Sequence, residues 1–414
     1  MHKLAKLAGA AIAAWLTASS AGAVEIEYWQ YTFKGRVDAI DELIARFQAA
    51  NPDVTVKHTH FPYDDYRTKV AAAIPAGEGP DVVQLFYGWL DDYVRAGLLR
   101  PLPKDRFDPA RIDTEFFPIV QAMKRDGAYM ALPTAVRSLA LFYNKKLLDD
   151  AGVGAPATLD ELVTVAKAVT KRDDGGNLLV EGITAGMDAQ DHHWWREVLV
   201  RQFGGQPYSE DGTKVAYNDE AGIDALQFYV DLIQKEKVAQ IGFMDEPQAA
   251  FRAGRAGLHI DGSFRLGALA DVRGLEWGVA ELPAHNGIRS NFSSYWVNGV
   301  TSKADGDRLD AAYRFLEFIT SDEAMQLWVE TVGELPAKPS AALADANIAH
   351  PQYGPFVKGL EYAHATEFAN ESEQRRLVIE AVDRVLLQGM SVEESLGTAA
   401  AAEQKLLDEF HAGK

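Results

Sequence analysis

The sequence contains no cysteine among its 414 residues. This absence excludes disulfide bonds. It also excludes the lipid anchor of a secreted bacterial lipoprotein, which needs a cysteine at the cleavage site. The fold must therefore be stabilised by buried apolar area. A chain of this length can bury enough of it, and the length favours two domains.

Positive charge is also scarce. Lysine and arginine number 41 against 60 aspartates and glutamates, which gives a net charge of −19. An acidic chain repels the phosphates of nucleic acid and of anionic lipid. We therefore expect neither nucleic acid nor a membrane surface as a partner, and we attribute the acidity to solubility.

Familiar enzyme motifs are missing as well. The sequence has no G-x-S-x-G, no G-x-x-x-x-G-K and no H-E-x-x-H. The stretch GVGAPA at 152–157 lacks the third glycine of a dinucleotide-binding loop, and we expect no cofactor. A chain with 60 acidic residues always contains carboxylate pairs, so a secreted glycoside hydrolase or lyase remains the alternative to a binding protein.

The amino terminus has the pattern of a secretory signal peptide. Lys3 and Lys6 form a short basic region, and Ala8 to Leu16 is an apolar run too short to span a bilayer. The small residues Ala21 to Ala23 suit cleavage. We predict a signal peptide over residues 1–23 and a periplasmic protein without a lipid anchor. No later stretch is long and apolar enough to cross a membrane.

The mature chain alternates predicted strands and helices. Strand patterns occupy residues 24–31, 54–61 and 80–86, and helical patterns occupy 37–47, 63–74 and 90–99. Such alternation predicts an α/β fold with a parallel, doubly wound sheet.

Later segments follow the same alternation. Thr158 and Glu161 have the spacing of a capping box at the start of a helix over 158–169. The stretch 249–263 predicts a helix, a glycine stop at Gly257 and a short strand over 258–260. Two long helices, over 374–387 and 392–410, close the chain.

Four motifs occur in the order typical of one family. They are YNKKLL at 143–148, with Ala151, Gly152, Pro156 and Thr158 after it; FRAGRAGLHIDGS at 251–263; GEGPDVV at 77–83; and FITSDEAMQ at 318–326. Together they resemble the family 1 extracellular solute-binding proteins, the carbohydrate-binding subunits of ABC importers. The resemblance extends from Val24 to about Phe410.

This resemblance implies the type II periplasmic binding protein fold, in which a hinge joins two doubly wound α/β lobes. The N-terminal lobe would comprise residues 24–134 plus about 290–332, and the C-terminal lobe 135–289 plus about 333–414. The implied function is capture of a sugar, oligosaccharide or related polyol between closing lobes, and its delivery to the membrane permease subunits. We expect a monomer that contacts the permease transiently.

The stretch DHHWW at 191–195 admits three interpretations. His192 and His193 are adjacent, so on a helix they point about 100° apart and bind one metal ion poorly. We predict no metal site. Trp194 and Trp195 suit either a core or a cleft wall. Because the stretch follows a predicted strand at 182–185, we expect Trp194 in the cleft, Trp195 in the core, and a histidine bonding nearby.

Aromatic and polar residues gather near other strand ends. A pyranose has an apolar C–H face that a flat ring can cover, and a rim of hydroxyls that planar polar groups can bind. The remaining candidate ligand-binding residues in strand-end and loop positions are Gln30, Tyr31, Tyr87, Gly88, Trp89, Asp188, Asp261, Gly262, Ser263, Tyr295, Trp296 and Glu334.

Arg137 lies in the segment that would cross between the lobes. Many members of the resembling family carry a small or hydroxylic residue there. An arginine can donate paired hydrogen bonds to neighbouring hydroxyls, or bind a carboxylate, phosphate or sulfonate. Arg137 therefore indicates either an anionic sugar ligand or a salt bridge between the lobes.

Overall fold

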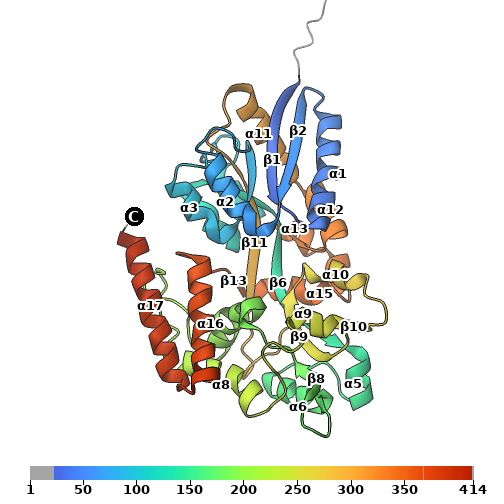
Figure 1. Ribbon diagram of the computed structural model, residues 1–414. Coiled ribbons are helices and arrows are strands. Elements are labelled where there is room, and N and C mark those ends of the chain that lie inside the picture. The colour runs from blue at the N-terminus through green and yellow to red at the C-terminus, as the bar shows by residue number, and fades with distance from the viewer. Residues whose placement is uncertain (1–22, 367, 413–414) are drawn as a thin grey trace, which may run out of the picture.

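The computed structural model describes residues 23–366 and 368–412, which form two lobes joined by long strands (Figure 1). The predicted signal peptide lies outside the described residues except for Ala23. We call the lobe containing β1, β2, β3, α1, α2, α3, α11 and α12 the N-lobe. The lobe containing β8, β9, α5, α6, α8, α16 and α17 is the C-lobe.

The N-lobe is organised around three parallel strands. Its elements are β1 (Val24–Tyr31), β2 (Val54–Phe61), β3 (Val82–Phe86), α1 (Lys34–Ala50), α2 (Tyr63–Ala73), α3 (Leu90–Arg95), α4 (Pro109–Glu115), α11 (Gly306–Ile319) and α12 (Asp322–Val332). β1 pairs in parallel with β2 on one side and with β3 on the other. Four of the five β3 residues are buried, which explains their nearly continuous apolar sequence.

Two long strands run between the lobes. β6 (Leu132–Asn144) and β11 (Asn291–Val300) are antiparallel to each other and form the centre of the main sheet. β11 pairs with β3 through residues 296–300, and β6 pairs with β9 through residues 139–143. One continuous sheet therefore extends through both lobes.

The C-lobe packs helices around the other end of this sheet. Its elements are α5 (Lys145–Ala151), α6 (Leu159–Val169), β7 (Lys171–Arg172), β8 (Leu178–Ile183), α7 (Val200–Gln202), α8 (Glu220–Gln234), α9 (Pro247–Arg252), β9 (Ala256–Gly262), α10 (Arg265–Ala270), β10 (Trp277–Ala280), α16 (Glu371–Gln388) and α17 (Val392–Ala412). The segment between α12 and α16 contains β12 (Leu335–Pro336), α13 (Pro339–Ala342), α14 (Asp345–Ala349), α15 (Gly354–Gly359) and β13 (Ala363–His364). Earlier in the chain, β4 (Lys124–Arg125) and β5 (Ala128–Tyr129) form a separate antiparallel hairpin.

The capping box predicted for α6 is present. The Thr158 hydroxyl accepts from the backbone N–H of Glu161, and the Glu161 carboxylate accepts from the backbone N–H of Ala157. These bonds satisfy amides at the helix start that have no partner within the helix.

Two details of the predicted fold were wrong. The sheet is mixed, because the crossover strands β6 and β11 run antiparallel to their neighbours. The glycine that follows α9 is Gly254, with φ of +69°, and not Gly257. Gly257 lies inside β9, where a Cβ would approach Val169 Cγ2 to 2.4 Å, so close packing explains this glycine.

The predicted lobe boundaries coincide with the crossover region. Residues 134/135 fall inside β6, residue 290 directly precedes β11, and 332/333 is the end of α12. These boundaries remain a prediction, since the shared sheet has no natural break at those positions.

A buried polar network fixes α17 to the rest of the C-lobe. The side chains of Glu403 and Arg196 are fully buried, with Arg196 Nη2 3.5 Å from Glu403 Oε2. Tyr217 donates to the same oxygen at 2.6 Å, while Tyr208 at 2.5 Å and Gln374 at 2.8 Å donate to Oε1. Both oxygens of one carboxylate therefore link α17 to α16 and to the segments before α8.

We expect Glu403→Ala to lower the free energy of unfolding by about 3–5 kcal/mol, because it leaves Arg196 buried without its counter-charge. Glu409→Ala removes an exposed carboxylate from the same helix and should cost no more than about 0.5 kcal/mol. Denaturant unfolding of the two variants measures this difference, and equal losses would contradict the role assigned to Glu403.

Candidate functional site

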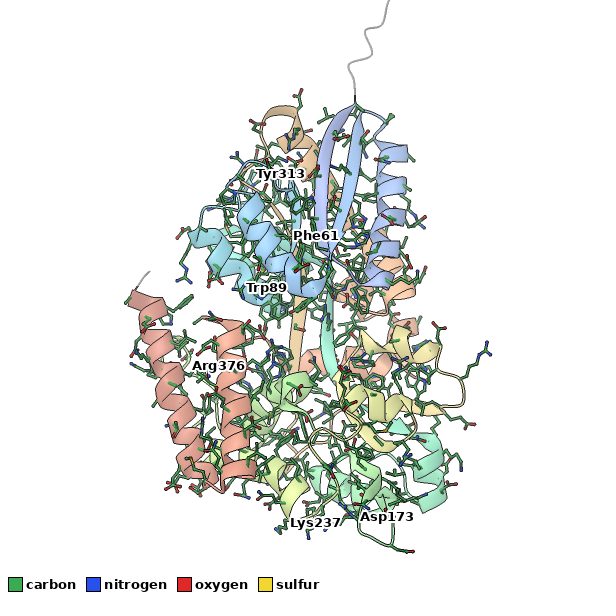
Figure 2. The ribbon with its side chains drawn as sticks, viewed as in Figure 1. Phe61, Trp89, Asp173, Lys237, Tyr313 and Arg376 are labelled. Atoms are coloured by element: carbon green, nitrogen blue, oxygen red, sulfur yellow. The ribbon has the colours of Figure 1, made fainter. Side chains whose placement is uncertain are left out.

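A cleft of about 230 Å³ lies where the two lobes meet at the crossover strands. Its lining comprises Tyr31, Tyr63, Phe86, Arg137, Asp188, Ala189, Gln190, His192, His193, Ser294, Trp296, Glu371 and Arg375. The lining residues come from both lobes and from both crossover strands, although they are up to 344 positions apart in the sequence. Figure 2 labels Trp89 in the N-lobe and Arg376 on α16 of the C-lobe.

The N-lobe contributes an aromatic wall, which we define as Tyr31, Tyr63 and Trp296. The rings of Tyr31 and Trp296 have centroids 4.2 Å apart, and Tyr63 meets Tyr31 edge-on at 5.5 Å. Tyr31 and Trp296 are almost completely buried, whereas Tyr63 is 48% exposed. The wall therefore consists of two fixed rings and one ring that is open to water.

Arg137 and Ser294 form the floor of the cleft, and strand register places Glu334 behind them. Ser294 of β11 lies directly opposite Arg137 of β6. On the other side of β6, β12 pairs Leu335 with Val136, which places the preceding Glu334 beside Arg137. Arg137 Nε lies 2.6 Å from Glu334 Oε1. Arg137 thus forms a salt bridge, although both partners fall within the predicted C-terminal lobe, so this pair is not the bridge between the lobes that the sequence suggested.

Glu334 has a second cationic partner behind the aromatic wall. Arg36 of α1, 1% exposed, forms an ion pair with the same carboxylate, and Trp328 Nε1 donates to it at 2.8 Å. The Arg36 guanidinium carbon lies 5.0 Å from the Tyr31 ring centroid and 5.3 Å from that of Trp296. Cation–π contacts of this kind add to the stability of the wall.

The C-lobe wall begins with irregular helical turns. After β8 the chain forms π-helical turns over Met187–Asp191 and Trp194–Leu199, and Ala189 inside the first of them has non-helical torsions (φ −89°, ψ −124°). π-helical turns are rare and often occur at functional sites. Here they bring Asp188, Gln190 and the two histidines to the cleft.

The two histidines are packed as flat, neutral groups. Their ring centroids are 3.7 Å apart, and His193 also stacks on Phe292 at 3.8 Å and 13°. Burial, followed by the nearby charges of Arg196 and Arg375, lowers the pKa of His192 to about 3. Burial also holds the pKa of His193 well below its usual range. Both rings are therefore uncharged at neutral pH.

Polar atoms of two cleft-lining residues lack hydrogen-bond partners. Nδ1 of His193 and Nη2 of Arg137 are buried and make no hydrogen bond with described residues. Buried polar groups normally have partners, because leaving one unpaired costs about 1–3 kcal/mol. Atoms of this kind beside a cleft are suited to bind a polar ligand.

The expectation that Trp194 faces the cleft was wrong. Trp194 is 1% exposed and packs edge-on against Phe228 and Tyr229 in the core of the C-lobe. Trp195 is also buried there, against Tyr217. The large apolar area of both tryptophans therefore stabilises the lobe, and the histidines before them line the cleft.

Six of the candidate residues line the cleft: Tyr31, Arg137, Asp188, His192, His193 and Trp296. Glu334 and Trp89 lie directly behind this lining. Trp89 is 4% exposed, with its ring centroid 5.4 Å from that of Trp296.

The other candidates lie away from the lining. Gln30 is completely buried. Tyr87 stacks on Tyr295 at 4.7 Å, the Tyr295 hydroxyl donates to the Ile119 carbonyl, and Gly88 lines a separate cavity of about 10 Å³. Asp261, Gly262 and Ser263 are also buried.

Asp261 is occupied by its own neighbours. Its carboxylate accepts from Arg265 Nε at 2.7 Å and from the Gly262 backbone, and it contacts His259 Nε2 at 3.1 Å. Burial opposes ionisation, but Arg265 and His259 outweigh it and hold the pKa of Asp261 below its ordinary value. Asp261 therefore binds its own neighbours at the end of β9 and does not line the cleft.

Sequence reasoning missed several residues of the lining: Tyr63, Phe86, Ala189, Gln190, Ser294, Glu371 and Arg375. Tyr63 begins α2, directly after the end of β2, a position at which the strand-end argument could have found it. Glu371 and Arg375 lie on the first turns of α16, far along the chain, and no local sequence pattern marks them as cleft residues.

Within residues 23–366 and 368–412, no cluster of three or more histidine, aspartate or glutamate side chains is arranged to hold a metal ion. None of the described helices combines the length and the hydrophobicity of a membrane span.

Comparison with known proteins identifies the family. The family model described as bacterial extracellular solute-binding protein matches residues 42–355, and the chain belongs to this family. Members are binding proteins, so the resemblance seen in the four sequence motifs is confirmed.

Individual relatives agree with this assignment. The maltotriose-binding protein of Pyrococcus abyssi is 26% identical over 353 residues, covering 83% of this chain and 73% of the relative. The fold matches that of a cyclic alpha-maltosyl-1,6-maltose binding protein from Arthrobacter globiformis with a TM-score of 0.81 and 24% identity, over 94% of this chain and 100% of that one. UgpB from Mycobacterium tuberculosis, solved in complex with glycerophosphocholine, gives a TM-score of 0.80 and 20% identity, over 94% and 99% of the two chains.

The low pKa of His192 predicts a loss of stability in acid. The unfolded chain takes up a proton near pH 6.5 whereas folded His192 does not, so the free energy of unfolding falls as the pH drops below 6.5. Between pH 7 and pH 5 the wild type should lose about 2 kcal/mol more than His192→Gln. Denaturant unfolding at both pH values measures the difference.

Gln190→Ala is the control, because it alters the same wall without removing a titrating group. It should keep the pH dependence of the wild type. An identical pH dependence in His192→Gln would contradict the assignment of a buried neutral imidazole.

Proposed function

We propose that this protein is the periplasmic receptor of an ABC importer and captures a carbohydrate between its two lobes. The observation that carries the proposal is the composition of the cleft. Aromatic rings on the N-lobe side face polar side chains from the C-lobe, across a floor of strand residues. This pairing matches the apolar face and the hydroxyl rim of a sugar ring.

Ligand capture in this proposal is a population shift. The lobes exchange between open and closed arrangements, and a ligand that contacts both walls stabilises the closed one. No bond is made or broken. The closed form then docks transiently, as a monomer, on the membrane permease, and the first 23 residues are removed during export. Family membership and the sugar-binding relatives support this proposal over a glycoside hydrolase or lyase.

A ligand screen tests the proposal. The mature protein is heated with sugars, oligosaccharides, polyols and sugar acids, and compounds that raise the melting temperature are titrated by calorimetry. We expect at least one carbohydrate to bind one-to-one and to be recovered unchanged. Recovery of a cleaved product would favour a glycoside hydrolase or lyase. If no compound in the screen raises the melting temperature or binds, the carbohydrate receptor is rejected.

Tyr63→Ala tests the aromatic wall. Because this ring is half exposed, its removal should leave the melting temperature of the free protein nearly unchanged. It should weaken carbohydrate binding about threefold to tenfold, the value of one ring contact. Tyr63→Phe keeps the ring and should bind within about twofold of the wild type. Equal affinities for all three proteins, measured by calorimetry, would remove Tyr63 from the site.

A further inference from the structure

Two arginines share one glutamate behind the cleft floor. Glu334 is 2% exposed and forms ion pairs with both Arg36 and Arg137. Its second oxygen accepts from Trp328, which is neutral. One negative charge therefore serves two guanidinium groups, and this group of three ionised side chains carries one excess positive charge.

The two arginines occupy different positions relative to the cleft. Arg36 lies behind the aromatic wall and is 1% exposed, so its ion pair with Glu334 is structural. The Arg137 side chain, 13% exposed, belongs to the cleft lining and packs over the Phe264 ring at 4.9 Å. Its Nη2 is buried without a hydrogen-bond partner among the described residues. Arg36 also has buried nitrogens without hydrogen-bond partners among the described residues, but of the two arginines only Arg137 lines the cleft. The excess positive charge is therefore available to a ligand at Arg137, where desolvation makes an unpaired charge costly.

The other charges of the cleft do not offset Arg137. Glu371 and Arg375 pair with each other, with Oε1 and Nε 3.6 Å apart, and contribute no net charge. Asp188 is exposed, and water and salt screen an exposed carboxylate strongly. His192 and His193 line the same space as flat hydrogen-bonding rings.

The surroundings of Arg137 are suited to an acidic oxygen group. Arginine offers planar, paired N–H donors that match a carboxylate or a phosphate. Ser294 lies directly across from it in the strand register and also lines the cleft, so its hydroxyl can donate to the same group. Cross-strand neighbours of this kind have Cβ atoms about 5 Å apart, within reach of one shared ligand group.

We propose that the ligand is an anionic carbohydrate whose acidic group binds Arg137 and Ser294 while its sugar ring lies against Tyr31, Tyr63 and Trp296. This assignment rests on the proposed carbohydrate-receptor function and specifies its substrate class. The negative charge of the acidic group would neutralise the one positive charge that Glu334 does not offset in Arg36 and Arg137. A carboxylate and a phosphate share the required chemistry, and the test separates them.

The test is calorimetry of the mature protein with matched ligands: glucose, glucuronate and glucose 6-phosphate, and galactose and galacturonate. We expect one acidic member to bind at least about tenfold more tightly than its neutral parent, and the better of uronate and phosphate identifies the acidic group. Arg137→Gln should reduce this preference to below about threefold. Arg137→Lys keeps the charge without the paired donors and should retain part of the preference.

Arg376→Gln is the matched control, because it removes an exposed arginine of α16 that lies outside the cleft lining and pairs with Glu373. It should keep the preference for the acid. Melting curves establish that each variant is folded. If Arg137→Gln does not fold, the preference for the acid is measured on Arg137→Lys instead.

Three outcomes would overturn the proposal. If the wild type binds neutral sugars as tightly as their acids, the anionic assignment fails and the carbohydrate receptor stands. If the preference survives in Arg137→Gln, another group recognises the acid. If no carbohydrate, neutral or acidic, binds at all, the proposed function fails with it.

Discussion

The antiparallel pairing of β6 with β11 is the interaction on which the rest of this molecule depends. Each strand belongs to both lobes, so their shared hydrogen bonds hold the lobes together and also form the floor of the cleft. The register of this pairing sets Ser294 opposite Arg137, and β12 adds Glu334 on the other side. A slip of one residue would turn these side chains to the other face of the sheet.

The two walls of the cleft are stabilised in different ways. On the N-lobe side, closely packed aromatic rings lie against a buried Arg36–Glu334 pair, and this wall combines dispersion, cation–π and ionic contacts. On the C-lobe side, histidine rings stack above a core that contains Trp194 and Trp195. At the far edge, α17 reaches the N-lobe, where the Arg95 guanidinium carbon lies 4.4 Å from the Phe410 ring centroid.

Periodicity and turn chemistry predicted most of the fold, because both are local. The strands at 24–31 and 54–61, the Thr158 cap and the two closing helices follow directly from residue spacing. The strand-end argument also found Tyr31, Trp296 and the histidines. It failed for Trp194 and Asp261, since strand-end position does not specify which way a side chain turns. Glu371 and Arg375 reach the cleft only through the packing of α16, which depends on contacts distant in sequence.

The central claim is that the lobes close on a ligand, and a distance measured across the cleft tests it most directly. The natural chain has no cysteine, so Thr68→Cys on α2 and Arg376→Cys on α16 introduce two unique labelling sites at exposed positions of opposite lobes. Single-molecule energy transfer between them should show a population with a longer separation that shifts to a shorter one as carbohydrate is added, with the midpoint at the calorimetric Kd. An unchanged distance at saturating carbohydrate would contradict the account.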